Sequence, residues 1–237
     1  MRERERERLD IIASDSWYAN DVNKVTIHHS YQLFMKYINP QDNVLELGPA
    51  EGTGTAELVK HVSKLTVVEG AELFCDELKK CYPDITVVHS LFEEYTPTEK
   101  FDKIILGHVL EHVENPVEIL KLVKSWLSDN GLILTAVPNS HSIHRQAAVL
   151  MGLLKSEKEL NETDKHHGHR RVYNTEEFKQ DFLKAGLLVK EIGGYWLKPI
   201  SNKQLEESWT KEMLDAFMVL GERYPDIAAE MFLIAEK

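Results

Sequence analysis

Cysteine is scarce in this sequence, since only Cys75 and Cys81 occur among 237 residues. The two lie six positions apart in one predicted helical stretch, a spacing that matches no metal-binding motif. Small secreted domains and cysteine-ligated zinc sites both need more cysteines than this. We therefore expect two free thiols in a reducing compartment, and we exclude a disulfide-stabilised scaffold.

Long apolar runs are also missing. No stretch approaches the roughly 20 residues that span a bilayer, and the first eight residues, MRERERER, lack the apolar core of a signal peptide. We expect a soluble cytoplasmic protein with no membrane partner.

The alternating charges of Arg2–Arg8 can pair with one another at helical spacing, so this run is predicted to be solvated and to bury nothing.

Basic residues are outnumbered, because 28 Lys and Arg stand against 39 Asp and Glu, for a formal net charge of −11. No basic stripe offsets the acidic excess, and such a surface repels a phosphate backbone. We therefore predict that no nucleic acid is a partner.

The hydrophobic fraction of 43% and the charged fraction of 28% are ordinary for a globular chain. Residues 1–40 are predicted to form a helical cap, which Pro40 ends. Residues 41–237 are predicted to form the main domain, with residues 139–173 as an inserted helical segment after the fifth strand. Strands alternate with helices here, the pattern of a doubly wound sheet. The predicted strands are Val44–Leu47, Lys64–Val68, Ile85–Val88, Lys103–Leu106, Leu132–Val137, Leu187–Ile192 and Glu230–Ala235.

The stretch from Asn43 to Thr55, NVLELGPAEGTGT, joins an apolar strand to a glycine-rich turn and a helical pattern that runs to Lys60. N–H groups at a helix N-terminus bind anions, and glycines let a ligand approach the backbone closely. Gly48 and Gly52 lack the spacing of the dinucleotide-binding fingerprint, and Glu46 stands where that fingerprint carries an apolar residue. The stretch therefore indicates a nucleotide site of another kind.

This stretch resembles the E/D-x-G-x-x-x-G loop of class I S-adenosylmethionine (SAM) dependent methyltransferases, and the resemblance is close over residues 42–136. The resemblance implies an α/β fold with a doubly wound, seven-stranded, mostly parallel, Rossmann-like sheet whose last strand is antiparallel. It also implies SAM as the cofactor and S-adenosylhomocysteine as its product.

Residues that follow the strands are expected to bind this cofactor. Glu69 ends the second strand, 23 positions after Glu46, where a carboxylate can accept two hydrogen bonds from a ribose diol. Leu91 and Phe92 follow the third strand and are expected to contact the adenine ring. The predicted cofactor-binding residues are Glu46, Gly48, Pro49, Gly52, Glu69, Gly70, Leu91, Phe92 and His108.

The segment HVLEHVENP, which begins at His108, resembles the EHV.NP signature of methyltransferases like the ubiquinone-pathway O-methyltransferases. In that subgroup the Glu–His pair, here Glu111 and His112, joins an acid near position 108 in holding a divalent cation. His108 reduces the charge available to magnesium, which prefers oxygen ligands, so we predict no metal. His112 is either an active-site group or a histidine hydrogen-bonded to the backbone.

The methyl acceptor is expected on the side of the histidines and arginines. A hydroxyl acceptor benefits from a general base of near-neutral pKa, so the catalytic candidates are His108, His112 and His169. Residues 169–173, HRRVY, resemble a GH.R.Y segment that related enzymes place beside the acceptor, where an arginine can clamp a carboxylate. Aromatic groups of the N-terminal helices can enclose a sulfonium. The predicted substrate-binding residues are Trp17, Tyr18, His28, Tyr31, Asn139, Arg170, Arg171 and Tyr173.

The sequence thus predicts a SAM-dependent methyltransferase that acts on an oxygen, carboxylate or hydroxyl, of a small molecule or short peptide. A small amine is the alternative acceptor, and a SAM-binding regulatory or scaffold protein without catalysis is the alternative function. A nicotinamide-dependent oxidoreductase is excluded by Glu46, by the glycine spacing and by the final apolar strand. Both a monomer and a homodimer are compatible with the sequence.

Overall fold

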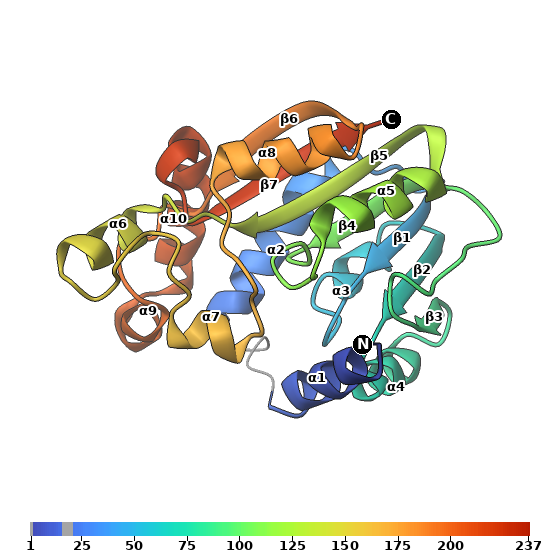
Figure 1. Ribbon diagram of the computed structural model, residues 1–237, viewed down its shortest axis with the longest axis horizontal. Helices are drawn as coiled ribbons and strands as arrows, with labels where there is room; N and C mark the ends of the chain where they lie inside the picture. The colour runs from blue at the N-terminus through green and yellow to red at the C-terminus, as the bar shows by residue number, and fades with distance from the viewer. Residues whose placement is uncertain (1, 16–20) are drawn as a thin grey trace.

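The computed structural model describes residues 2–15 and 21–237, and over this part of the chain seven strands form one sheet of order β3-β2-β1-β4-β5-β7-β6. Strands β1 to β5 pair in parallel, whereas β7 runs antiparallel to both β5 and β6 (Figure 1). The predicted fold class is therefore confirmed. The strands are β1 (Asn43–Leu47), β2 (Lys64–Glu69), β3 (Thr86–His89), β4 (Phe101–Gly107), β5 (Leu127–Pro138), β6 (Leu188–Tyr195) and β7 (Glu230–Glu236).

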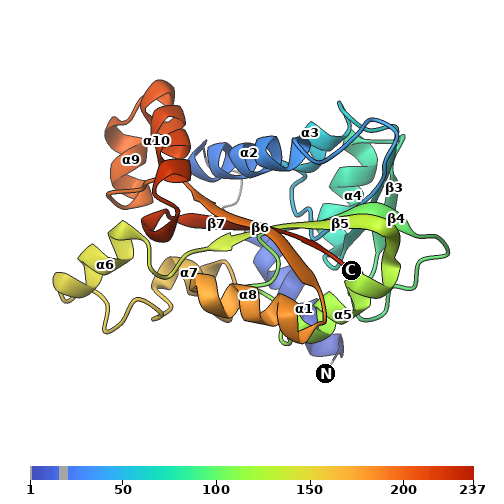
Figure 2. The same ribbon diagram turned by 90° about the horizontal axis from the view of Figure 1, so that it is seen from above.

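Helices cover both faces of the sheet, as Figure 2 shows. One face packs against α5 (Pro116–Trp126) and α8 (Thr175–Lys184), whose buried side chains join the larger apolar core. The other face packs against α2 (Asp21–Met35), α3 (Thr55–Leu58), α4 (Glu72–Cys81), α9 (Asn202–Ser208) and α10 (Lys211–Arg223). Because both faces are covered, central strands such as β1 are buried along nearly their whole length.

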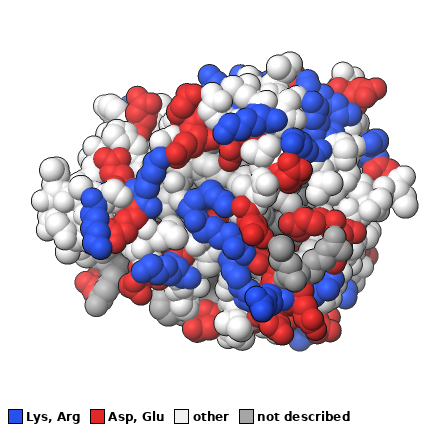
Figure 3. Space-filling view, in the orientation of Figure 1, with Lys and Arg blue, Asp and Glu red and all other residues white. Residues whose placement is uncertain are grey.

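The remaining helices lie toward the carboxyl ends of the parallel strands. α1 (Arg2–Ser14) packs against α4 at this edge (Figure 1). The segment between β5 and α8 contains α6 (Ile143–Leu150) and α7 (Glu162–His166). No helix within residues 2–15 and 21–237 combines the length and the apolar character needed to cross a membrane. On the face seen in Figure 3, acidic and basic side chains are interspersed.

Several predicted elements differ from the structure. The amphipathic pattern from Gln204 to Arg223 predicts a single helix, but the structure divides it into α9 and α10, because Trp209 is extended and the Thr210 side chain caps the second helix. The helix predicted to continue to Lys60 ends as α3 at Leu58. Strand β5 begins at Leu127, earlier than predicted, and a shift of register separates the partners of Leu127 and Leu132.

The start of α8 also differs from the sequence prediction. Thr175 is predicted to cap this helix, but Asn174 is the N-cap, and its side chain accepts a 2.8 Å hydrogen bond from the Glu177 N–H. Glu177 completes a capping box by accepting from the Asn174 N–H. Phe178 is buried in the core, as expected.

Candidate active site

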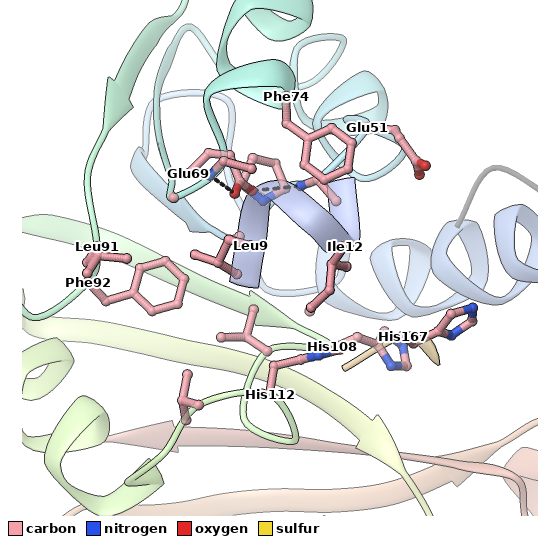
Figure 4. A pocket seen from close by; sticks show the side chains of 18 of the residues that line it. Leu9, Ile12, Glu51, Glu69, Phe74, Leu91, Phe92, His108, His112 and His167 are labelled. Atoms are coloured by element: carbon pink, nitrogen blue, oxygen red, sulfur yellow. Dashed lines mark hydrogen bonds between the residues drawn. The ribbon is translucent and has the colours of Figure 1, made fainter. Parts of the chain in front are cut away.

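A cavity of about 350 Å³ opens at the carboxyl ends of the parallel strands. Its walls come from the segments that follow β1, β2, β3 and β4, together with α1, two residues of α2 and His167 (Figure 4). Ligands of doubly wound sheets bind at this edge, and the volume suits a small-molecule ligand. The fold therefore brings the strand-end residues that the sequence singled out to one place.

The turn after β1 depends on its glycines. Gly48 and Gly52 have φ angles of +63° and +80°, in the left-handed region that side chains disfavour. A Cβ atom on Gly52 would also lie 2.8 Å from Leu78 Cδ2 in the core. Gly48 and Pro49 line the cavity, whereas Gly52 shapes the turn behind it.

Glu69 is held in the cavity wall by the backbone. One carboxylate oxygen accepts from the Ala71 N–H at 2.9 Å and the other accepts from the Ala50 N–H at 3.1 Å. Burial raises the pKa of Glu69, although these N–H groups act in the opposite direction. Each carboxylate oxygen has further lone pairs, so the fixed group can also accept from a ligand diol. Its neighbour Gly70 lines the same wall.

The apolar end of the cavity lies beside Glu69. Leu91 and Phe92, the two residues predicted to contact adenine, line it after β3. The lining residues that sequence reasoning missed include Phe74 of α4, and Leu9 and Ile12 of α1. Figure 4 shows Leu9 and Ile12 projecting from α1 into the space between Phe74 and His112.

The charged run at the N-terminus is predicted to bury nothing, and the structure contradicts this. Glu5 and Arg8 line the cavity, and the Arg8 guanidinium donates to Glu5 and to the Gly168 carbonyl. Arg6 pairs with Glu94 of the segment after β3. The sequence feature that could have predicted this packing is the apolar pair Leu9 and Ile12. These two residues share one helix face immediately after the charged run.

Glu46 contributes to the cavity wall through the side chains that it holds in place. It is fully buried, does not appear among the residues that line the cavity, and accepts from Tyr31 Oη at 2.5 Å and from Thr55 Oγ1 at 2.6 Å. Burial raises the pKa of Glu46 to about 7. The Tyr31 ring lies over Gly54 and Gly107, since a Cβ on Gly54 would be 2.1 Å from Tyr31 Cζ. The carboxyl group thus fixes an aromatic ring in the cavity wall.

His108 follows β4 with a φ angle of +59°, a conformation uncommon for a residue with a side chain. Its Nε2 lies 3.1 Å from Tyr195 Oη, and its Nδ1 lies 3.5 Å from Glu111 and 3.8 Å from Glu230. Burial lowers the pKa of His108, but the two carboxylates outweigh burial, so the net pKa is raised. The two carboxylates therefore stabilise the charged form of His108 against the effect of burial.

Two other histidines of the cavity wall favour the uncharged form. Burial lowers the pKa of His112 to about 3 and that of His167 to about 4. His169 does not line the cavity but packs edge-on against His112, with 4.7 Å between the ring centroids. The structure therefore groups the three predicted catalytic histidines around Glu111, with His108 and His112 at the cavity.

Arg170 and Arg171, the arginines predicted to bind an acceptor carboxylate, form hydrogen bonds with other groups of the protein. Arg171 donates to the carbonyls of Leu110, Val113 and Glu114, and Arg170 donates to the His112 carbonyl and to Glu5. Neither arginine is among the residues that line the cavity. Both hold the segment after β4 in place, so the structure does not aim them at an acceptor.

Other predicted substrate contacts also have structural partners. Asn139 is buried and donates to the carbonyls of Asp226 and Ala228, while Tyr173 donates to Asp181. His28 lies on the surface beside Gln32, outside the cavity lining. Of this group, Tyr31 lines the cavity. Trp17 and Tyr18 lie outside the described residues.

The sheet order with its antiparallel β7, the glycine turn after β1 and the acid at the end of β2 define a class I SAM-dependent methyltransferase. Residues 18–192 match the sequence profile of the family described as "Methyltransferase domain". The chain belongs to this family. SAM is accordingly its cofactor, and the sequence prediction of both family and cofactor is confirmed.

Relatives and solved structures agree with this assignment. A curated relative from Glaesserella parasuis serovar 5, "Ubiquinone biosynthesis O-methyltransferase", is 28% identical over 208 residues, which cover 78% of this chain and 84% of that protein. A SAM-dependent methyltransferase structure from Mesorhizobium loti aligns with a TM-score of 0.63 at 12% identity, covering 88% of this chain and 98% of the other. The N-methyltransferase NodS from Bradyrhizobium japonicum WM9, crystallised with S-adenosylhomocysteine, aligns with a TM-score of 0.59 at 15% identity, covering 99% and 97%.

Proposed function

We propose that this methyltransferase transfers the methyl group of SAM to an oxygen atom of a small molecule, and that a hydroxyl is favoured over a carboxylate. The observation that carries the proposal is the polarity of the cavity wall at the end of β4. His112 and His167 line that wall with their pKa values lowered by burial, so both present uncharged imidazoles at neutral pH. An uncharged imidazole can accept a hydrogen bond from a hydroxyl.

A carboxylate acceptor would need a cationic partner in the cavity. Arg170 and Arg171 are bound to carbonyl groups, and Arg8 is paired with Glu5. His108, the histidine of the cavity wall whose charged form is stabilised, already faces Glu111 and Glu230. The name of the curated relative, an O-methyltransferase at 28% identity, also supports an oxygen acceptor. The structural relatives have less than 25% identity and therefore inform the fold rather than the acceptor.

The cofactor supplies an electrophilic methyl group on a sulfonium, so the protein contributes binding, orientation and exclusion of water. In the proposed arrangement Glu69 accepts from the ribose, and Leu91 and Phe92 pack against the adenine. The Tyr31 ring, which Glu46 fixes, borders the region beside Gly107 where the reacting groups would meet. α1 covers the cavity with Leu9 and Ile12 and so limits the access of water.

The test is methyl transfer from isotopically labelled SAM to a panel of phenols, aliphatic alcohols, carboxylates and primary amines, with product identification by mass spectrometry. We expect ether formation on a hydroxyl acceptor. Glu69→Ala is the matched control, since loss of the ribose contact should reduce transfer to every acceptor alike. Methylation of the amines alone would overturn the oxygen assignment, and tight SAM binding without any transfer would favour a binding protein.

A further inference from the structure

Glu111, His112 and His169 form a cluster at the edge of the cavity. Within the described residues, one ligand atom from each lies within 4.8 Å of the other two. Two of the residues belong to the segment after β4, and the third belongs to the segment after α7, 57 positions beyond His112. The fold therefore joins two distant segments at this point.

Glu111 lacks the partners that a buried carboxylate needs. Its side chain is fully buried, and in the part of the chain that the structure describes neither carboxylate oxygen accepts a hydrogen bond. The nearby His108 Nδ1 lies 3.5 Å from one of the oxygens, too far for a well-formed hydrogen bond. His108 offsets part of the Glu111 charge, but both oxygens still lack the hydrogen bonds that a buried carboxylate needs. Metal ions commonly satisfy such a buried carboxylate.

An acid lies beside the His169 ring, as it does behind many metal-binding histidines. The His169 Nδ1 faces Asp164 Oδ1 at 3.5 Å, an ionic contact rather than a well-formed hydrogen bond. Asp164 is fixed in turn, because it accepts from Arg145 at 3.1 Å and from the Asn161 N–H at 2.9 Å. A carboxylate behind the histidine is the usual outer arrangement of a metal site.

His108 does not contribute the third ligand that the EHV.NP resemblance leads one to expect. Position 108 is a histidine rather than an acid, and its ring nitrogens face Tyr195 on one side and Glu111 and Glu230 on the other. The third donor near Glu111 and His112 is His169 instead. Two imidazoles and one carboxylate suit zinc and related transition metals better than magnesium, which prefers oxygen ligands.

We propose that Glu111, His112 and His169 bind a divalent cation of the zinc class, and that this cation ties the segment after α7 to the segment after β4. The tie would extend to α1, because the adjacent Arg170 contacts both the His112 carbonyl and Glu5. The site is a feature of this chain's own ligand set. With the cation bound, the acceptor nitrogen of His112 would face the cation, and His167 would be the uncharged imidazole of the cavity wall that faces the substrate hydroxyl.

The test is titration of the chelator-treated full chain with cobalt(II), which substitutes for zinc and reports low-symmetry coordination by its visible absorption. We expect one equivalent of cobalt to bind with an intense visible band, zinc to abolish the band, and excess magnesium to leave it unchanged. His169→Ala should lose the band. Asp164→Asn should weaken cobalt binding by about 10- to 100-fold, the usual effect of removing an outer partner.

His141→Ala is the matched control, because His141 lies in the same inserted segment but is exposed and paired with Glu157. It should keep the full cobalt band. His169→Gln, which preserves more of the side-chain volume, replaces His169→Ala if the alanine variant does not fold by circular dichroism. The proposal would be overturned if the parent chain showed no cobalt band, or if the band persisted without His169. It would also be overturned if magnesium abolished the band as readily as zinc.

Discussion

Glu69→Gln tests whether the acid at the end of β2 binds the cofactor ribose. The carboxylate is fixed by the N–H groups of Ala50 and Ala71, at 3.1 Å and 2.9 Å, so its position does not depend on the ligand. Glutamine keeps the shape of the side chain but presents one oxygen and one NH₂ group. Its NH₂ group can accept neither from a ribose hydroxyl nor from the adjacent backbone N–H.

The expected loss follows from these contacts. A hydrogen bond to a charged group contributes about 1.5–3 kcal/mol. Because about 1.4 kcal/mol corresponds to a tenfold change in affinity, the loss of one such bond should weaken binding by roughly 10- to 150-fold. A backbone N–H left unsatisfied by Glu69→Gln lowers the stability of the free and the bound protein alike, so it does not enter this loss of affinity.

Isothermal titration calorimetry with S-adenosylhomocysteine measures the effect directly. Glu72→Gln is the matched control, since Glu72 is an exposed acid at the start of α4 and its loss changes the net charge by the same amount. The same titrations with a ribose-deoxy analogue complete a double-mutant cycle. If Glu69→Gln bound as tightly as the parent chain, or lost as much affinity for the deoxy analogue as for the natural ligand, the ribose assignment would be refuted.

Three further predictions follow from other contacts in the site. Gly54→Ala should weaken SAM binding and destabilise the fold by about 1–3 kcal/mol, because its Cβ would lie 2.1 Å from Tyr31 Cζ; unchanged affinity and thermal midpoint would contradict this contact. Burial raises the pKa of Glu46 from 4.5 to about 7, so the folded chain keeps a proton that the unfolded chain releases, and stability should fall as the pH rises between these values. Since one pKa unit corresponds to 1.36 kcal/mol, the parent chain should lose about 3 kcal/mol of unfolding free energy over this pH range, and Glu46→Gln should not show that loss. Urea unfolding at pH 4 and pH 8 checks this. An equal effect of the substitution on the unfolding free energy at both pH values would refute it. Leu9→Asp should displace α1 and weaken SAM binding by up to about tenfold, because full burial of a leucine contributes about 1.5–3 kcal/mol and Leu9 is partly buried. Calorimetry and tryptic cleavage within Arg2–Arg8 report the change, and Ile11→Asp, at a position 70% exposed on the same helix, should leave both at parent values.

The sheet could be predicted from sequence because its determinants are local. Each strand from β1 to β5 is a short apolar run bounded by turn or helix signals, and buried parallel strands require such runs. Glu69 could be singled out for the same reason, since an acid directly after a buried strand must lie at the edge where ligands bind. The register shift in β5 had no such signal, because the pairing of Phe101 with Leu127 depends on the neighbouring strand.

The cavity wall could be predicted only in part. The functions assigned to Arg170 and Arg171 rested on charge and position, but each guanidinium found carbonyl partners about 57 to 61 residues away in the chain. Arg8 similarly donates to Gly168. The guanidinium of arginine can donate to both carbonyls and carboxylates, so its residue type does not reveal which partner the fold will supply.

The sequence by itself determined the parallel sheet and the glycine turn, because strand periodicity and the backbone freedom of glycine act over a few residues. The cofactor followed from the resemblance of this stretch to the loop of class I methyltransferases. The tertiary structure decided which helix covers the cavity, which histidines meet Glu111 and which charges are already paired. These contacts join residues such as His112 and His169 that are far apart in the chain. Their proximity depends on how the segments after β4 and α7 pack together, which no local pattern encodes.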